Sequence, residues 1–379
     1  MQVQPLVDLT DHVDRPVELQ KIELLTRDDH WFVRVRSHDG VGLAVVSPRL
    51  RTFFPIFEQC VAPQWLGKDV RQLGDCVMHG SRGKSAYKFG MPTWVCCAAM
   101  ELATLDLLGK LSGKGVGELA GGRKRDSLRV YLSHTGRHLG GEGEAELFAS
   151  RLEATGARAI KYKIGGRMSK NADAWPGRTE DVVATLAARF PHCQQWADAN
   201  GSYDVAHATD VAKLLVDHGV TVFEEPCEFD EYEQTATVRE ACEDLPLAIA
   251  GGEQDHALSR FRWQCEHRAV DILMPDPNYC SGLGRLLQVA ATAKSAGLVI
   301  SPHSPMGGPA GLPLLHAASL VDNLHEFVEW SVHAPPPPSW YEPALEVVDG
   351  SIVVPDGEGL GMTYDEDFVA SAETVAHLR

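Results

Sequence analysis

The chain has 379 residues, with 35 Lys and Arg against 52 Asp and Glu, and a formal net charge of −17. This length fits one large domain plus a smaller one rather than a single small module. The acidic surface would repel phosphate backbones, which disfavours nucleic-acid binding. The sequence shows no apolar run near the roughly 20 residues of a spanning helix, and its first residues lack the features of a secretion signal. We therefore expect a soluble cytoplasmic protein that binds neither nucleic acid nor membrane.

Nine cysteines are spread along the chain, and none forms a C-x-x-C pair. A zinc ribbon or a thioredoxin-like site is therefore disfavoured. We expect reduced, mostly buried thiols.

The first 125 residues predict an α+β domain. Residues 17–47 alternate apolar and polar side chains and contain two turn signals, which predicts a three-stranded meander. Residues 53–120 are helical in pattern, most clearly over 94–111, where apolar residues recur at helical spacing. That helix should end near Gly109 or Gly113.

The pattern changes after Asp126, where eight short apolar or β-branched runs alternate with helical stretches. Eight such units over roughly 200 residues predict a (β/α)8 TIM-like barrel over residues 126–332. A doubly wound sheet is the alternative, but the glycine-rich phosphate turn after its first strand is missing. The predicted strands are 127–133, 159–165, 194–200, 220–226, 247–253, 270–276, 298–304 and 325–331.

Residues 333–379 follow the predicted barrel. Four consecutive prolines, Pro335–Pro338, form a stiff extended connector. A hairpin with an Asp349-Gly350 turn comes next, and we expect it to return to the N-terminal capping domain.

Polar residues stand where seven of the predicted strands end. Active sites of such barrels lie at the carboxyl ends of the strands, so these residues should share one rim. Asp198, Glu224 and Glu253 close three successive strands and offer the hard oxygen ligands that suit Mg²⁺. Each carboxylate alone is more often a helix cap or a solvated group. The full set is Lys161, Lys163, Asp198, Asn200, Glu224, Glu253, Asp276, His303 and Glu329.

Lys161 and Lys163 lie two apart on one strand and share a face. Helices cover the outer face of a barrel strand, so both lysines should point into the mouth, with lowered pKa values. His303 follows Asp276 by one unit, and the two could form a hydrogen-bonded dyad.

These residues fall in the motifs K-Y-K, D-A-N, E-E-P, G-G-E, M-P-D and S-P-H, which begin at 161, 198, 224, 251, 274 and 301. Together the motifs resemble those of the enolase superfamily, in its mandelate racemase-like subgroup. The resemblance implies that Asp198, Glu224 and Glu253 bind one Mg²⁺. It also implies that Lys163 is the general base, tuned by Lys161, with His303, oriented by Asp276, on the opposite face of the substrate. Glu329 would bind the substrate carboxylate, with Asn200 as a weaker candidate.

The chemistry so implied is removal of the proton α to a carboxylate. We expect the substrate to be a small carboxylate, most simply an acid sugar that loses water to give a 2-keto-3-deoxy acid. A racemase, epimerase or cycloisomerase would use the same residues, and a non-catalytic metal-binding barrel is the alternative from another class. A symmetric homo-oligomer is also expected.

Overall fold

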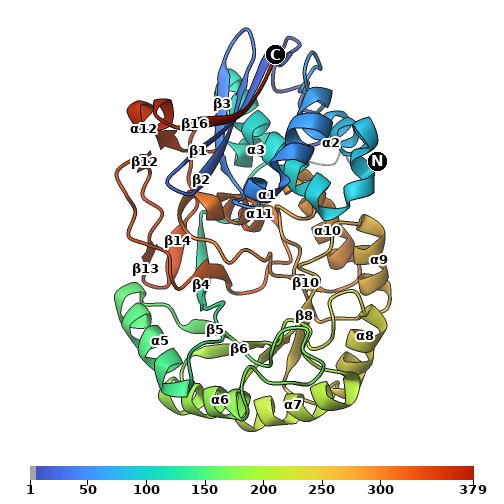
Figure 1. Cartoon of the computed structure of the whole chain (residues 1–379), viewed down its shortest axis with the longest axis vertical. Coiled ribbons are helices and arrows are strands. Elements are labelled where there is room, and N and C mark those ends of the chain that lie inside the picture. Colours follow the sequence, from blue (N-terminus) through green and yellow to red (C-terminus); the bar gives the residue numbers. More distant parts are fainter. Residues whose placement is uncertain (1–5) are drawn as a thin grey trace.

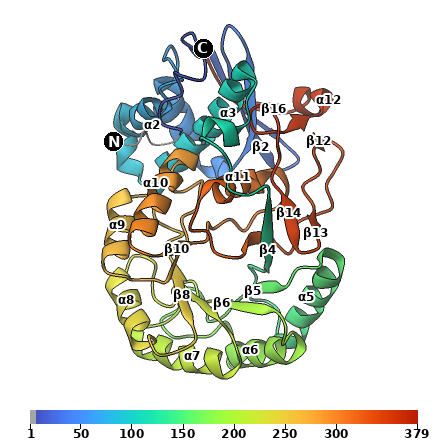
Figure 2. The same cartoon turned by 180° about the vertical axis from the view of Figure 1, so that it is seen from behind.

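A computed structural model describes residues 6–379 and shows a capping domain beside a barrel (Figure 1). The first five residues, on which part of the expected absence of a secretion signal depends, lie outside the described residues. Near the start of the described chain, the carbonyl of Val7 accepts a hydrogen bond from Gly74 N, and the marked C-terminus lies in the capping domain in the two opposite views (Figures 1 and 2). The chain therefore leaves the capping domain, forms the barrel and returns.

The capping domain contains a four-stranded antiparallel sheet in the order β16-β1-β2-β3. The predicted meander is confirmed, because Asp28 and Asp29 both have positive φ and form the tight turn between the first two strands. The fourth strand comes from the C-terminus and pairs with β1. The strands are β1 (Lys21–Arg27), β2 (His30–Arg36), β3 (Val41–Val46) and β16 (Glu373–Leu378).

Helix α3 (Met91–Ser112) is the core of the capping domain and ends at Gly113, which has a φ of 66°. Its mean hydropathy of 1.3 over an 18-residue window makes it long and apolar enough to span a membrane, contrary to our reading of the sequence. However, 83% of that window is buried, against β2, β3 and the neighbouring helices. The other helices are α1 (Leu50–Ile56), η1 (Phe57–Val61), η2 (Ala62–Gln64), α2 (Leu73–Arg82), η3 (Gly83–Phe89) and α4 (Val116–Leu119).

All eight predicted barrel strands form, and they are parallel neighbours in chain order. The ring closes where β11 pairs with β4, and where the backbone of Ile300 bonds to Asn323 and His325. The strands are β4 (Ser127–Ser133), β5 (Ala159–Lys163), β6 (Gln194–Asp198), β7 (Val222–Glu224), β8 (Ala248–Gly251), β9 (Ile272–Leu273), β10 (Val299–Ile300) and β11 (Val328–Ser331).

One helix follows each of the first seven barrel strands, and several of them form the outer ring seen in Figures 1 and 2. Across the described residues 332–365 no helix follows β11, and the chain runs back to the capping domain instead. The helices are α5 (Gly141–Thr155), α6 (Arg178–Arg189), α7 (Val205–Asp217), α8 (Tyr232–Ala241), α9 (Leu258–Glu266), α10 (Gly282–Ser295) and α11 (Leu312–Leu320).

The predicted hairpin forms at Asp349-Gly350, where both residues have positive φ. Its expected partner is wrong, because β14 pairs with β4 of the barrel. Residues 127–129 of β4 extend beyond its ladders with β5 and β11, so their free backbone groups can pair with a short antiparallel strand. The later strand β16 reaches the capping sheet instead. The remaining elements are β12 (Tyr341–Glu342), β13 (Val347–Val348), β14 (Ser351–Val353), β15 (Thr363–Tyr364) and α12 (Glu366–Ala370).

All nine cysteines are free thiols and seven are buried, as the sequence predicts. Burial raises the pKa of the Cys76 and Cys227 thiols to about 12, so these groups stay protonated.

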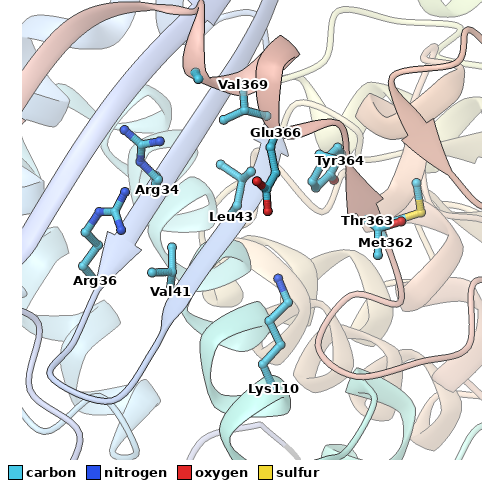
Figure 3. A pocket seen from close by; sticks show the side chains of 11 residues that line it. Arg34, Arg36, Val41, Leu43, Lys110, Met362, Thr363, Tyr364, Glu366 and Val369 are labelled. Atoms are coloured by element: carbon cyan, nitrogen blue, oxygen red, sulfur yellow. The ribbon is translucent and has the colours of Figure 1, made fainter.

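A groove of about 530 Å³ lies on the capping domain, between β2, β3 and the C-terminal segment (Figure 3). Its cationic side chains already have anionic partners. Arg34 and Arg36 contact Glu23 at 2.7 and 3.4 Å, and Lys110 contacts Asp106 at 2.6 Å. The groove therefore has little free charge with which to attract an anionic substrate.

Candidate active site

The carboxyl ends of the barrel strands bring the predicted polar residues together. Lys163, Asp198 and Glu224 are direct register neighbours on β5, β6 and β7. Glu253, Asp276 and His303 come two or three residues after the ends of β8, β9 and β10. All nine predicted side chains are buried.

Lys161 is fully buried at the centre of the barrel. Its Nζ lies 2.8 Å from Glu224 Oε1 and 2.9 Å from Glu329 Oε1. It also lies 5.4 Å from the centre of the Tyr131 ring, which stacks on Trp196 in the barrel interior. Burial lowers the pKa of Lys161, but the carboxylates of Glu224 and Glu329 outweigh burial and hold it well above its usual range. The expectation of a lowered pKa is therefore wrong for Lys161.

Lys163 stands one pleat nearer the mouth, and its Nζ contacts Asp198. The Asp198 carboxylate is also held by Asn200, whose backbone N–H donates to Oδ1 at 2.8 Å and whose amide donates to Oδ2 at 3.2 Å. Burial raises the pKa of Asp198, but the nearby Lys163 and Lys161 charges lower it to about 2. The carboxylate is therefore ionised.

His303 forms the predicted dyad with Asp276, at 2.9 Å between Nδ1 and Oδ2. Backbone N–H groups of Asn278 and Tyr279 donate to the other oxygen of Asp276 and fix its orientation. The second imidazole nitrogen lies 3.0 Å from Glu253 Oε2. Burial disfavours the charged imidazole, but the surrounding carboxylates outweigh it and raise the pKa of His303 well above its usual value.

Glu329 points into the barrel, where its Oε2 accepts a hydrogen bond from Ser304 N at 2.8 Å. Glu326, of opposite parity on the same segment, pairs with Arg129 at the exposed outside of the barrel. The structure thus places Glu329 beside Lys161 and His303, and its contact with substrate stays a prediction.

Negative charge is in excess in this cluster, and some of it lacks a partner. Besides Arg137 at the rim, six buried acidic side chains face three cationic ones. Oε2 of Glu224 and Oε1 of Glu225 are buried without a hydrogen-bond partner. Burial raises the pKa of Glu224 to about 8, and a bound divalent cation would favour the ionised form instead. The acidic residues are Asp198, Glu224, Glu225, Glu253, Asp276 and Glu329, and the cationic ones are Lys161, Lys163 and His303.

The donor set therefore fits a hard divalent cation by its chemistry. In the described part of the chain, no three acidic, histidine or cysteine side chains already surround one metal position. The reason is visible in the contacts: Asp198, Glu224 and Glu253 each hold a different cationic side chain.

Three residues near this site were not predicted from the sequence. Glu225 would alternate away from Glu224 in a regular strand, but its φ of 43° turns it back into the cluster. Arg137 spans the ends of β5 and β6 and donates to Asn200 Oδ1 at 3.0 Å. Tyr279 lies with its ring 6.2 Å from that of His303 and accepts a 2.6 Å bond from Arg49 of the capping domain.

Residues 144–368 match the family described as enolase C-terminal domain-like. The chain belongs to this family. It is a member of the enolase superfamily, in the mandelate racemase-like subgroup, and the capping domain and barrel are those of that superfamily.

Two curated relatives of this enolase superfamily member catalyse reactions of sugar acids or their lactones. D-galactarolactone cycloisomerase from Agrobacterium fabrum is 28% identical over 280 residues, which cover 71% of each chain. Arabinonate dehydratase from Saccharolobus solfataricus is 27% identical over 273 residues, which cover 70% of this chain and 69% of the relative.

Solved structures agree on the arrangement of the whole chain. A proposed racemase from Roseobacter denitrificans is 31% identical, with a TM-score of 0.87, over 96% of this chain and all of that one. A mandelate racemase/muconate lactonizing protein from Paracoccus denitrificans, complexed with magnesium, is 25% identical, with a TM-score of 0.84. It aligns with 95% of this chain and 99% of its own.

Proposed function

We propose that this protein removes the proton α to the carboxylate of an acid sugar and eliminates water to give a 2-keto-3-deoxy acid. The observation that carries the proposal is the placement of Lys163 and His303. Each contacts a different member of the carboxylate set, Lys163 at Asp198 and His303 at Glu253, with Glu224 on the strand between them. A substrate held at these carboxylates through a cation would have one acid/base group on each side.

Each group has a definite task in this proposal. Lys163 takes the α-proton, and His303 gives a proton to the β-hydroxyl, which leaves as water. The resulting enol becomes the 2-keto-3-deoxy acid. Asp276 keeps the His303 ring oriented through Nδ1, so that Nε2 faces the substrate.

Asp198, Glu224 and Glu253 would hold one Mg²⁺, which supplies positive charge as negative charge develops on the substrate carboxylate. Lys161 is fully buried between Glu224 and Glu329, so it acts on the field of the site rather than on the substrate directly. Support for magnesium comes from the unpartnered carboxylate oxygens and from the magnesium bound in the relative from Paracoccus denitrificans.

A cycloisomerase is the second candidate, because a curated relative acts on D-galactarolactone. In that case the α-proton is removed in the same way, but a lactone oxygen leaves instead of water. We favour dehydration because His303, oriented by Asp276, would supply the proton that the leaving hydroxyl needs, and because another relative is an arabinonate dehydratase.

The deciding experiment incubates the protein and Mg²⁺ with aldonic acids, aldaric acids and their lactones in D₂O. We expect a 2-keto acid from at least one substrate, with deuterium entering the product. Lys163→Ala and His303→Asn should each lower kcat by about 10²–10⁴-fold, the usual effect of losing an acid/base group. Lys213→Ala, on the exposed face of α7, is the matched control and should leave kcat unchanged.

The same panel contains the outcomes that contradict dehydration. An isomer or an opened lactone without any 2-keto acid would assign the second candidate. Near wild-type dehydration by Lys163→Ala would remove Lys163 as the base.

Chelation tests the cation separately. Treatment with a chelator should abolish turnover, and Mg²⁺ should restore it and raise the melting temperature, because binding to the folded state stabilises it. Full activity of the metal-free protein, or a melting temperature indifferent to Mg²⁺, would refute the metal site.

A further inference from the structure

Three charged or titratable side chains are completely enclosed behind the two lysines of β5. Arg178, Glu144 and His134 are at most 1% exposed. Arg178 is the first residue of α6, Glu144 lies in the first turn of α5, and His134 directly follows β4. Because none of the three is open to solvent, they are out of reach of a substrate.

The three side chains form one continuous network. Arg178 Nη2 donates to Glu144 Oε1 at 3.0 Å, and the other Glu144 oxygen lies 2.7 Å from His134 Nδ1. Trp175 covers the Arg178 guanidinium, whose carbon lies 5.2 Å from the ring centre. Burying such charges is costly unless every partner is in place, so the network tolerates little movement.

The network ends on the backbone of the strand that carries the lysines. Arg178 Nη1 donates to the carbonyl of Lys163 at 2.7 Å, and the backbone N–H of His134 donates to the carbonyl of Lys161 at 2.9 Å. The same guanidinium donates through Nε to Leu139 O at 2.9 Å. One arginine thus fixes the last residue of β5 against the loop after β4 and the helices α5 and α6.

We infer that Arg178, with Glu144 and His134, is a positioning group for Lys163. It sets the place of the Lys163 backbone, and therefore the direction in which the ammonium leaves the strand. This inference depends on the proposed function, in which Lys163 is the base. A base must lie within hydrogen-bond reach of the proton it removes, so a small displacement lowers kcat, while binding of substrate through the other strands continues.

Two variants separate positioning from general stability. Arg178→Lys keeps the charge but loses the forked donors that reach Lys163, Leu139 and Glu144 together. We expect kcat per folded protein to fall by about 10- to 100-fold, with KM and the Mg²⁺ requirement changed by less than about threefold. Glu144→Gln keeps the shape of the side chain, should lower kcat less, and carries the test if Arg178→Lys does not fold. The double variant should lose less than the product of the two single effects, because the residues act as one unit.

Arg125→Lys is the matched control, since Arg125 also donates to two backbone carbonyls, of Ala318 and Val321, near the opposite end of β4. Its kcat should stay at the wild-type value even where its melting temperature falls. A crystal structure of Arg178→Lys should show Lys163 Nζ displaced from Asp198.

Measuring Lys163→Ala beside these variants distinguishes failure of the positioning role of Arg178 from failure of the proposed function. If Lys163→Ala is inactive while folded Arg178→Lys turns over within twofold of wild type, the positioning role is overturned and the proposed function stands. If Lys163→Ala is active, the proposed function is overturned. The crystal structure then decides the inference alone: an undisplaced Lys163 refutes it.

Discussion

The Lys161 ammonium group is buried in the barrel, where its charge is stabilised only by neighbouring carboxylates. It is fully buried, and Glu224 and Glu329 lie within 2.9 Å on either side. Removing one member of a buried ion network leaves an uncompensated charge, which typically costs about 3–5 kcal/mol. The lysine is therefore as much a folding requirement as a functional one.

We predict that Lys161→Met lowers the free energy of unfolding by several kcal/mol and abolishes activity. Lys163→Met should lower stability less, because Lys163 contacts one carboxylate and keeps 7% of its side chain exposed. Urea unfolding of both variants, followed by circular dichroism, measures the difference. Equal stability of the two proteins would contradict this account of Lys161.

The residues of the site were predictable from the sequence where the strand pattern is regular. Asp198 and Glu224 end successive strands and Glu253 comes two residues after the next one, and their common rim follows from the barrel alone. Glu225 could not be found in this way, because a left-handed backbone is rare for glutamate and no neighbouring residue indicates it. The raised pKa of Lys161 could not be predicted in this way either, since it depends on how closely Glu224 and Glu329 approach the ammonium in the folded barrel.

At the scale of the elements, the contact between β3 and α3 is unusually close at Gly42. A Cβ at this position would lie 2.1 Å from the carbonyl oxygen of Ala103 and 2.8 Å from the backbone nitrogen of Leu107. Both neighbours are backbone atoms of α3, which cannot move without shifting the helix.

We predict that Gly42→Ala lowers the free energy of unfolding by about 3 kcal/mol, at the upper end of overpacking effects. Gly143→Ala, in α5, is the comparison. There the nearest atoms lie at 3.3 Å on the Leu139 side chain, and alanine favours the helix. Gly143→Ala should leave the free energy of unfolding unchanged or raise it slightly. Thermal unfolding of both proteins measures the contrast, and a Gly42→Ala protein as stable as Gly143→Ala would rule out the close contact.

The elements themselves followed from hydrophobic periodicity, including β9 and β10, whose ladders are only two residues long. What periodicity cannot supply is the partner of a strand. The Asp349-Gly350 turn was readable, but the hairpin could pair with either domain, and it pairs with β4. The long helix α3 was likewise recognised by its pattern, but its burial on all sides depends on distant elements.

At the scale of the whole molecule, the capping domain and the barrel meet where α3 packs against α10. Glu101 of α3 is buried at this contact, and its Oε1 accepts a 3.1 Å bond from Gly284 N in the first turn of α10. Its other oxygen has no hydrogen-bond partner. Burial raises the pKa of Glu101 to about 8, although the backbone N–H groups and Arg285 oppose that rise. The folded protein therefore favours the protonated carboxyl.

The pH dependence of stability follows from this shift. Below the ordinary pKa of 4.5, Glu101 is protonated in both the folded and the unfolded chain, so it does not make the free energy of unfolding depend on pH. Between 4.5 and about 8 it ionises only on unfolding, so each pH unit lowers the free energy of unfolding by about 1.4 kcal/mol. Glu101→Gln lacks this titration. Wild type should therefore lose stability relative to Glu101→Gln as pH rises from 5.5 to 7.5, measured by urea unfolding at matched salt. Parallel profiles for the two proteins would show that Glu101 is ionised in the folded state, and that the contact between the domains holds a charge rather than a neutral carboxyl.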